Sequence, residues 1–226
     1  MDLAKIKKLI NLAADLFFPP RCVFCGCVVS PGTKVCRKCA QEVVETSAIR
    51  YMNLSVSGEN IRCAALYTYR GVVRKSIVDF KFNGHREYAD YYAEQLAEQI
   101  PKSFPDFRFD AVTSVPISAE RKKKRGYNQS EWIARPLARR LNLPYRELLV
   151  KTRDNREQHM LDKKQRAKNV RGVYSALGTD AKGKSILLID DIVTTGATLS
   201  ECAKVLYGAG AKFVACAAVA QVPPES

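Results

Sequence analysis

Two adjacent aspartates, Asp190 and Asp191, follow the apolar run Ile186–Ile189 in the stretch "ILLIDDIVTTGATL". The turn two positions further on combines hydroxyl groups with a glycine, which lets a ligand approach the backbone closely. Where such a turn opens a helix, it presents N–H groups and the positive end of the helix dipole to a phosphate. Two carboxylates beside a phosphate repel it unless sugar hydroxyls donate to them and a divalent cation screens them. The pattern therefore predicts a site for a phosphorylated ribose with Mg²⁺. The turn comprises Thr194, Thr195, Gly196, Ala197 and Thr198.

Two other interpretations of this region are weaker. An aspartate that merely precedes a helix would explain one carboxylate but not two with a threonine-rich turn. The stretch Gly178–Ser185 matches the phosphate-loop pattern G-x-x-x-x-G-K-[ST]. A phosphate loop must open a helix, whereas Lys184 and Ser185 open the apolar run "ILLID". We therefore interpret Gly178–Ser185 as a polar turn between strands.

A second set of chemically competent residues consists of cysteines near the start of the chain. Cys22 and Cys25 form one pair, and Cys36 and Cys39 form another pair ten residues later. This spacing suits one tetrahedral zinc with four thiolate ligands, which closes the site and makes the metal structural. A disulfide pair would need an oxidising compartment, and no signal for export is evident. Cys27 is either a spare or a replacement for Cys25, and spacing alone leaves both open.

The elements that must position these residues alternate between strand and helix patterns after the cysteines. Such alternation predicts an α/β fold with a parallel sheet covered on both faces. Ligands of such sheets bind at the carboxyl ends of strands, so we expect Asp190 and Asp191 just past the end of a strand. The expected strands are 61–70, 109–116, 145–150, 169–176, 184–191 and 212–222, and the expected helices are 71–80, 86–100, 128–141 and 197–210.

The chain divides into two expected domains, 1–48 and 49–226, each with a core of its own. Apolar residues between Leu3 and Leu16 fall at helical spacing, which predicts an amphipathic helix packed on the first domain. Asp2 and the absence of a small-residue cleavage site argue against a signal peptide. No apolar run approaches about 18 residues, so we expect no membrane span and a cytoplasmic location.

Positive charge is concentrated in one segment. Arg121–Arg171 holds 17 basic and 5 acidic residues, which accounts for 12 of the 14 net positive charges. Such a block indicates contact with a polyphosphate or a nucleic acid, although a basic face that only aids solubility is the alternative. Twelve charges exceed what one pyrophosphate needs, which favours DNA contact. The aromatic residues nearby that could stack on bases are few: Tyr127, Trp132, Tyr145 and Tyr174.

The stretch "LLIDDIVTTGAT" is similar to the phosphoribosyl pyrophosphate (PRPP) signature of type I phosphoribosyltransferases. From Cys22 onward the chain resembles the ComF family. The resemblance rests on the cysteine module, "VPISAERKKKRGYNQS", "TRDNREQHMLDKKQRAKNVRGVY" and the PRPP loop. It implies a parallel-sheet type I phosphoribosyltransferase fold with a small N-terminal zinc-binding module. It also implies a link to natural competence, the uptake of DNA for transformation.

Residue by residue, the resemblance implies that Asp190 and Asp191 hold the ribose hydroxyls and that Thr194–Thr198 holds the 5′-phosphate. The turn after the strand "FDAVTSV" would take the pyrophosphate, and Lys81 would reach the site. His85 and His159 receive no catalytic role. The pyrophosphate turn is Val115, Pro116 and Ile117; the run bordering it includes Arg125, Gly126, Asn128 and Gln129; a basic loop includes Arg153, Gln158, Arg166 and Asn169.

Three classes of function follow from these patterns. The first is a phosphoribosyltransferase that acts on an unknown acceptor. The second is a nucleic-acid-binding competence factor that uses the PRPP site as a sensor, with competence-machinery proteins as partners. The third is a regulator that binds PRPP and, through the zinc module, a protein partner. Catalysis would displace pyrophosphate at the anomeric carbon, with Mg²⁺ and basic groups screening the departing charge. No residue stands out as an activating base, so the sequence leaves enzyme activity open. We favour the PRPP-binding protein that contacts single-stranded DNA.

Overall fold

The computed structural model describes residues 19–46, 50–53, 60–153 and 170–223. The amphipathic helix expected between Leu3 and Leu16 lies outside these ranges. Within them, no helix is long and apolar enough to cross a membrane.

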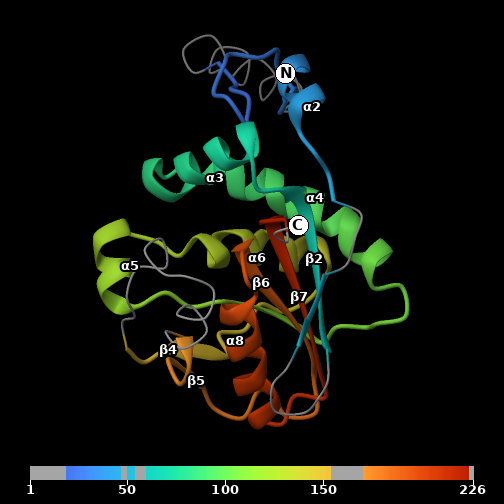
Figure 1. Cartoon of the computed structure of the whole chain (residues 1–226), viewed down its shortest axis with the longest axis vertical. Coiled ribbons are helices and arrows are strands. Elements are labelled where there is room, and N and C mark those ends of the chain that lie inside the picture. Colours follow the sequence, from blue (N-terminus) through green and yellow to red (C-terminus); the bar gives the residue numbers. More distant parts are fainter. Residues whose placement is uncertain (1–18, 47–49, 54–59, 154–169, 224–226) are drawn as a thin grey trace, which may run out of the picture.

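A five-stranded sheet forms the centre of the molecule (Figure 1). Four of its strands are parallel, which confirms the predicted fold class, and the edge strand β1 pairs antiparallel with β2. The inner strand β7 is buried from Val214 to Ala220, as expected for a strand covered on both faces. The strand order is β1 (Arg50–Asn53), β2 (Asn60–Thr68), β7 (Phe213–Gln221), β6 (Ser185–Val193) and β3 (Ala111–Ser114).

Helices cover both faces of this sheet and bury two apolar clusters. One cluster joins three helices to one face: α3 (Gly71–Asn83), α4 (Arg86–Ser103) and α6 (Gln129–Arg140). The other cluster lies between the opposite face and α8 (Ala197–Gly208). Because both faces are covered, the sheet leaves mainly the ends of its strands for a ligand.

Two of the predicted strands lie outside the main sheet. The strands β4 (Leu149–Lys151) and β5 (Tyr174–Ala176) pair antiparallel with each other. The segment before β4 contacts β3 through a single bridge between Tyr145 and Val112 and then leaves the sheet. Arg146 and Glu147 follow this bridge and are exposed, so the segment cannot continue as a buried strand. The prediction that strands 145–150 and 169–176 belong to the parallel sheet was wrong.

The turn interpretation of the phosphate-loop pattern is confirmed. Residues 178–183 form turns and bends, and Ser185 begins β6 rather than a helix. The backbone N–H of Ser185 donates to Asp110 at 2.8 Å, which fixes the start of the strand.

The cysteine module stands on α3 at one end of the molecule (Figure 1) and contains the short helix α2 (Arg37–Glu42). Its buried residues Cys22, Val23 and Phe24 belong to the same apolar cluster as the helices that cover the sheet. Phe24 packs edge-on against Tyr67 and Tyr91, with ring centroids 5.6 and 5.9 Å apart. The expectation of two separate cores was therefore wrong. So short a module cannot bury enough apolar surface alone.

Candidate functional site

The paired aspartates lie at the carboxyl edge of the sheet, inside β6 rather than past its end. β3 pairs with β6 only as far as Ile189, whereas β7 continues to pair with it up to Val193. Asp190 and Asp191 therefore lie in the part of β6 that extends beyond the end of β3 and is paired only with β7. This is the crevice between diverging strand connections where open α/β sheets bind their ligands.

Asp190 is held by two donors. The Ser130 hydroxyl and the backbone N–H of Asp191 both donate to Asp190 Oδ1 at 2.9 Å. Burial, reinforced by the charge of Asp191, raises the pKa of Asp190 to about 7 despite these donors. A carboxylate poised in this way accepts hydroxyl donors or a cation readily, because either relieves its unfavourable charge.

Asp191 is paired with a lysine from a different layer of the fold. Lys81 Nζ, from α3, lies 2.8 Å from Asp191 Oδ2, and the two side chains are 23% and 12% exposed. Lys81, which the family resemblance assigns to the site, thus contacts one of the two aspartates. The two carboxylates supply the hard oxygen ligands that Mg²⁺ prefers, and thus fit a divalent cation.

The threonine-rich turn leads into α8, which begins at Ala197 as predicted. Gly196 is the N-cap residue, so Ala197 and Thr198 belong to the first helical turn. The glycine provides no capping side chain to the N–H groups at this helix end. Thr195 Oγ1 accepts from the backbone N–H of Ala197 at 3.3 Å. The helix end thus retains the geometry that welcomes a phosphate.

Gly196 also allows a close contact that the sequence did not reveal. Its φ is +84°, which a residue with a Cβ rarely adopts, and a Cβ here would lie 2.5 Å from the sulfur of Met52. Met52 comes from β1, far from Gly196 in the sequence. No local pattern could have indicated this contact, because only the pairing of β1 with the sheet creates it.

The predicted pyrophosphate turn follows β3 and leads into α5 (Ala119–Arg125). The backbone N–H of Val115 donates to Ile189 at 2.9 Å, and the carbonyl of Val115 accepts from Asn128 Nδ2 at 2.9 Å. Pro116 and Ile117 are half-buried. Asn128 is the N-cap of α6. The start of α6 therefore holds two parts of the site. Asn128 binds the turn after β3, and Ser130 binds Asp190.

The other side chains of this run tie α5 to α3. Arg125 Nη1 donates to Gln129 Oε1 at 2.7 Å, and Gln129 Nε2 donates to the Lys81 carbonyl at 3.4 Å. Tyr127 donates its hydroxyl to the Phe80 carbonyl and stacks on Trp132 at 3.7 Å between centroids. The Tyr127 ring is therefore buried between α3 and α6 and is not a surface on which a nucleic-acid base can stack.

The predicted basic loop is described only at its start. Arg153 is exposed, and its guanidinium donates to the carbonyl of Arg171 at 2.9 Å. Gln158, Arg166 and Asn169 lie outside the described residues.

The cysteine centre consists of the four predicted residues. The sulfur atoms of the set all lie within 4.8 Å of one another, and those of Cys25 and Cys36 are 3.7 Å apart. A tetrahedral zinc with Zn–S bonds of about 2.3 Å separates its sulfur ligands by roughly 3.8 Å, so the geometry fits the metal. The backbone N–H of Cys39 lowers the pKa of Cys36 to about 6, which favours the thiolate that zinc requires. Cys27 is exposed and lies outside the set, which comprises Cys22, Cys25, Cys36 and Cys39.

Comparison with known families agrees with this geometry. Residues 127–225 match the phosphoribosyl transferase domain, and residues 13–49 match the double zinc ribbon domain. Fold and site together define a phosphoribosyltransferase-fold protein with an N-terminal zinc-binding module.

Comparison with individual proteins identifies the family within this class. Competence protein ComFC of Bacillus subtilis is 30% identical over 191 residues, which cover 84% of this chain and 72% of the relative. ComFC of Streptococcus pneumoniae is 29% identical over 183 residues, covering 81% and 79%. DNA utilization protein YhgH of Escherichia coli K12 is 35% identical over 106 residues, covering 46% of each chain, or about half. The chain belongs to the ComF family.

Proposed function

We propose that this protein binds PRPP together with Mg²⁺ at the carboxyl edge of β6. The observation that carries the proposal is the pair Asp190 and Asp191 beside a helix start whose N-cap residue is a glycine. Ribose hydroxyls would donate to the two carboxylates, and Mg²⁺ would screen them. In this arrangement Lys81 limits the repulsion between Asp191 and the ligand's phosphates. The 5′-phosphate would contact Thr194, Thr195, Gly196, Ala197 and Thr198, and the pyrophosphate would contact Val115, Pro116, Ile117 and Arg125.

In this proposal, PRPP binding serves a protein that handles DNA. Relatives are named for competence and DNA utilization, which suggests that the ligand site serves a protein that handles DNA. Lys122, Lys123 and Lys124 are exposed on α5, directly after the pyrophosphate turn. A single strand could follow this basic helix through its phosphates. Partner proteins of the competence machinery would then meet the protein on DNA.

A transferase acting on a small acceptor is the alternative. In that reaction the bond from the anomeric carbon to pyrophosphate breaks, a bond to the acceptor forms, and the acceptor loses a proton. The observation that favours it is the Lys81–Asp191 pair, which lies where basic groups could screen developing charge. Release of pyrophosphate from PRPP in the presence of nucleobases, but not of DNA, would support this alternative.

A thermal-shift assay tests the binding proposal. We expect PRPP with Mg²⁺ to raise the melting temperature, because a ligand that binds only the native state stabilises it. The double variant Asp190→Asn with Asp191→Asn should lose the shift yet remain folded. ATP with Mg²⁺ should give a smaller shift, and Lys184→Ala is the matched control because it alters only the phosphate-loop pattern. An unchanged PRPP response in the double variant would contradict the proposal.

A further inference from the structure

An exposed aromatic ring lies at the end of α3, one residue after Lys81. Phe82 is 69% exposed. Four large apolar side chains are exposed in the described part of the chain, and Phe82 is the only ring among them, beside Val28, Val150 and Leu177. The stacking candidates from the sequence are less accessible. Tyr127 and Tyr174 are buried, and Trp132 is covered on one face by Tyr127. Tyr145 is half-buried, and the guanidinium of Arg135 lies over its ring, 4.3 Å from the centroid.

A cation already lies against this ring. The guanidinium carbon of Arg125 is 5.5 Å from the centroid of Phe82, within the range of a cation–π contact. Arg125 is also hydrogen-bonded to Gln129 at 2.7 Å, which limits its movement. The ring and the guanidinium therefore form one surface, which we call the Phe82 platform and which consists of Phe82 and Arg125.

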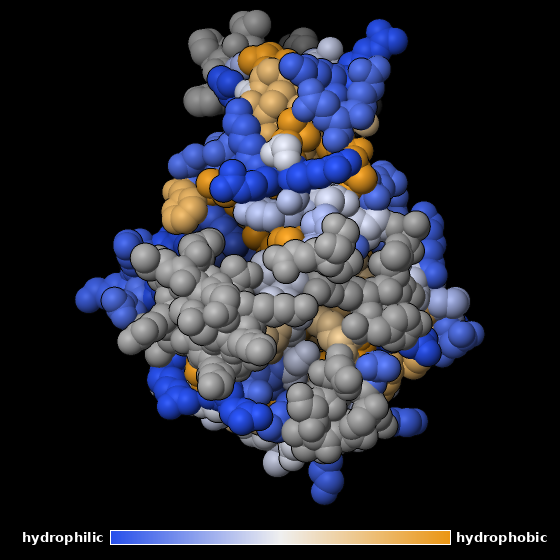
Figure 2. All heavy atoms as spheres, in the orientation of Figure 1, coloured by the Kyte–Doolittle hydropathy of each residue, from blue (hydrophilic) through white to orange (hydrophobic). Residues whose placement is uncertain are grey.

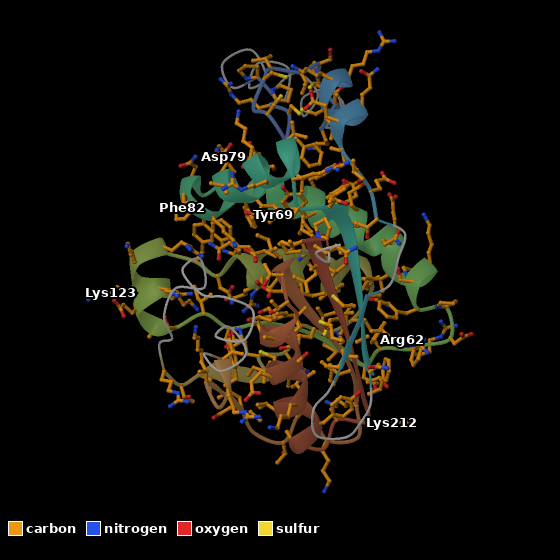
Figure 3. The ribbon with its side chains drawn as sticks, in the orientation of Figure 1. Arg62, Tyr69, Asp79, Phe82, Lys123 and Lys212 are labelled. Atoms are coloured by element: carbon orange, nitrogen blue, oxygen red, sulfur yellow. The ribbon has the colours of Figure 1, made fainter. Side chains whose placement is uncertain are left out.

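The surroundings of the platform are basic. α5 carries five basic residues and one acidic residue in seven positions. Lys122, Lys123 and Lys124 are exposed, although Lys122 Nζ lies 3.8 Å from Glu131. Figure 3 shows Phe82 beside α5, with Lys123 pointing outward on the same side, and Figure 2 shows a hydrophobic patch there next to a hydrophilic one. An aromatic surface bordered by lysines complements a base together with its phosphates, whereas an apolar protein partner would gain nothing from the lysines.

The platform also borders the proposed PRPP site. Lys81 precedes Phe82 and contacts Asp191, and Arg125 ends the helix that follows the pyrophosphate turn. The two elements that carry the platform, α3 and α5, therefore also carry residues of the proposed site. A base stacked there would be brought close to bound PRPP.

We propose that the Phe82 platform stacks an unpaired base of single-stranded DNA whose backbone follows the lysines of α5. The inference rests on the proposed function, because it requires that the protein contacts single-stranded DNA. Stacking on an aromatic side chain tolerates every base, so the platform gives affinity without sequence preference.

Fluorescence anisotropy with two oligomers of equal length, one of thymidylate and one abasic, tests the platform in the full chain. We expect Phe82→Ala to weaken binding of the thymidylate oligomer by about 5-fold or more, and to leave the abasic oligomer unaffected. Phe82→Trp should retain binding, and Val28→Ala is the matched control because it trims an exposed apolar side chain on the zinc module. Phe82→Ala should leave the salt dependence unchanged. Replacing Lys122, Lys123 and Lys124 with alanine should flatten its slope by about 0.7 per lost phosphate contact.

The outcomes separate the platform from the proposed function. If the parent protein binds neither oligomer, both the platform and the DNA role are wrong. If it binds thymidylate but Phe82→Ala binds equally well, only the platform is wrong. If Phe82→Ala weakens binding of both oligomers equally, the platform is also wrong, because the effect of the ring would then not require a base. Dissociation of a dimer by Phe82→Ala in sedimentation, with DNA affinity unchanged, would assign the ring to a second copy of the chain instead.

Discussion

Asp190 shows how a single residue can be arranged for a ligand at a cost in stability. Its carboxyl group is surrounded by β6, the start of α6 and the neighbouring Asp191, so its charged form is poorly solvated. The positive charge of Lys81 offsets only a small part of this rise in the pKa of Asp190. A carboxylate in such a place is stabilised when hydroxyl groups or a cation arrive, which is the behaviour expected of a ligand-binding residue.

The first prediction concerns the pH dependence of stability. The pKa of Asp190 is raised from 3.8 to about 7, so between these values the native state holds a proton that the unfolded chain has released. The contribution of Asp190 to stability is thus present at low pH and lost as pH rises through about 7. Asp190→Asn keeps the oxygen that Ser130 donates to but removes the charge. We expect the variant to be more stable than the parent at pH 8, by on the order of 4 kcal/mol, and nearly equally stable near pH 4. Urea unfolding at both pH values measures this, and an equal effect at both would show that the charge is not responsible.

At the scale of single residues, the predictions of the site residues rest on local signals in the sequence. The aspartate pair, the threonine turn and the four cysteines are each contained in a short pattern. Ser130 was missed because its contact with Asp190 spans 60 residues. Met52 was missed because its contact with Gly196 depends on where β1 is placed. Lys81 was anticipated only through family resemblance.

Among the elements, α3 connects the zinc module to the candidate site. Near its middle, the Ser76 hydroxyl donates to the Val23 carbonyl of the module and contacts the Tyr92 hydroxyl on α4. Near its end, Lys81 contacts Asp191. Because a helix can transmit displacement along its axis, we expect the position of Lys81 to depend on the packing of the module.

The second prediction follows from this connection. Cys36→Ser removes one of four zinc ligands, so the module should loosen and release α3. We expect a lower melting temperature for the whole protein and a smaller stabilisation by PRPP with Mg²⁺. Cys27→Ser is the matched control, since Cys27 is exposed and outside the ligand set. Zinc content and thermal shift should be measured together. A zinc-free variant with the parent's response to PRPP would show that the module and the site are independent.

The third prediction concerns the start of α8. Gly196→Ala places a Cβ at a φ of +84° and against Met52, so both strain and overlap should destabilise the protein. The left-handed conformation alone costs roughly 1–2 kcal/mol. Adding Met52→Ala should recover the part due to overlap and leave the rest. Urea unfolding of the two single variants and the double variant measures this coupling, and purely additive effects would mean that Met52 does not press on the turn.

For the whole molecule, the alternation of strand and helix patterns was enough to predict the parallel sheet and its two covered faces. It was not enough to separate β4 and β5 from that sheet, because short strands give the same local signal in either place. Nor did it show that Phe24 joins the apolar cluster of α3, α4 and α6, since a cysteine-rich module looks self-contained in the sequence. Local patterns therefore indicate the elements, while shared packing is decided by contacts between distant segments.

Calorimetric titration of PRPP in the presence of Mg²⁺ tests the central claim most directly. We expect one PRPP per chain. We expect binding to be lost when Mg²⁺ is removed by a chelator that has first been shown to leave zinc bound. The variant with Asp190→Asn and Asp191→Asn should show no binding, because the ribose hydroxyls and Mg²⁺ would lose the carboxylates that hold them. If the parent protein gives no binding heat at several temperatures, or if the double variant binds PRPP as tightly as the parent, the two aspartates do not form a PRPP site.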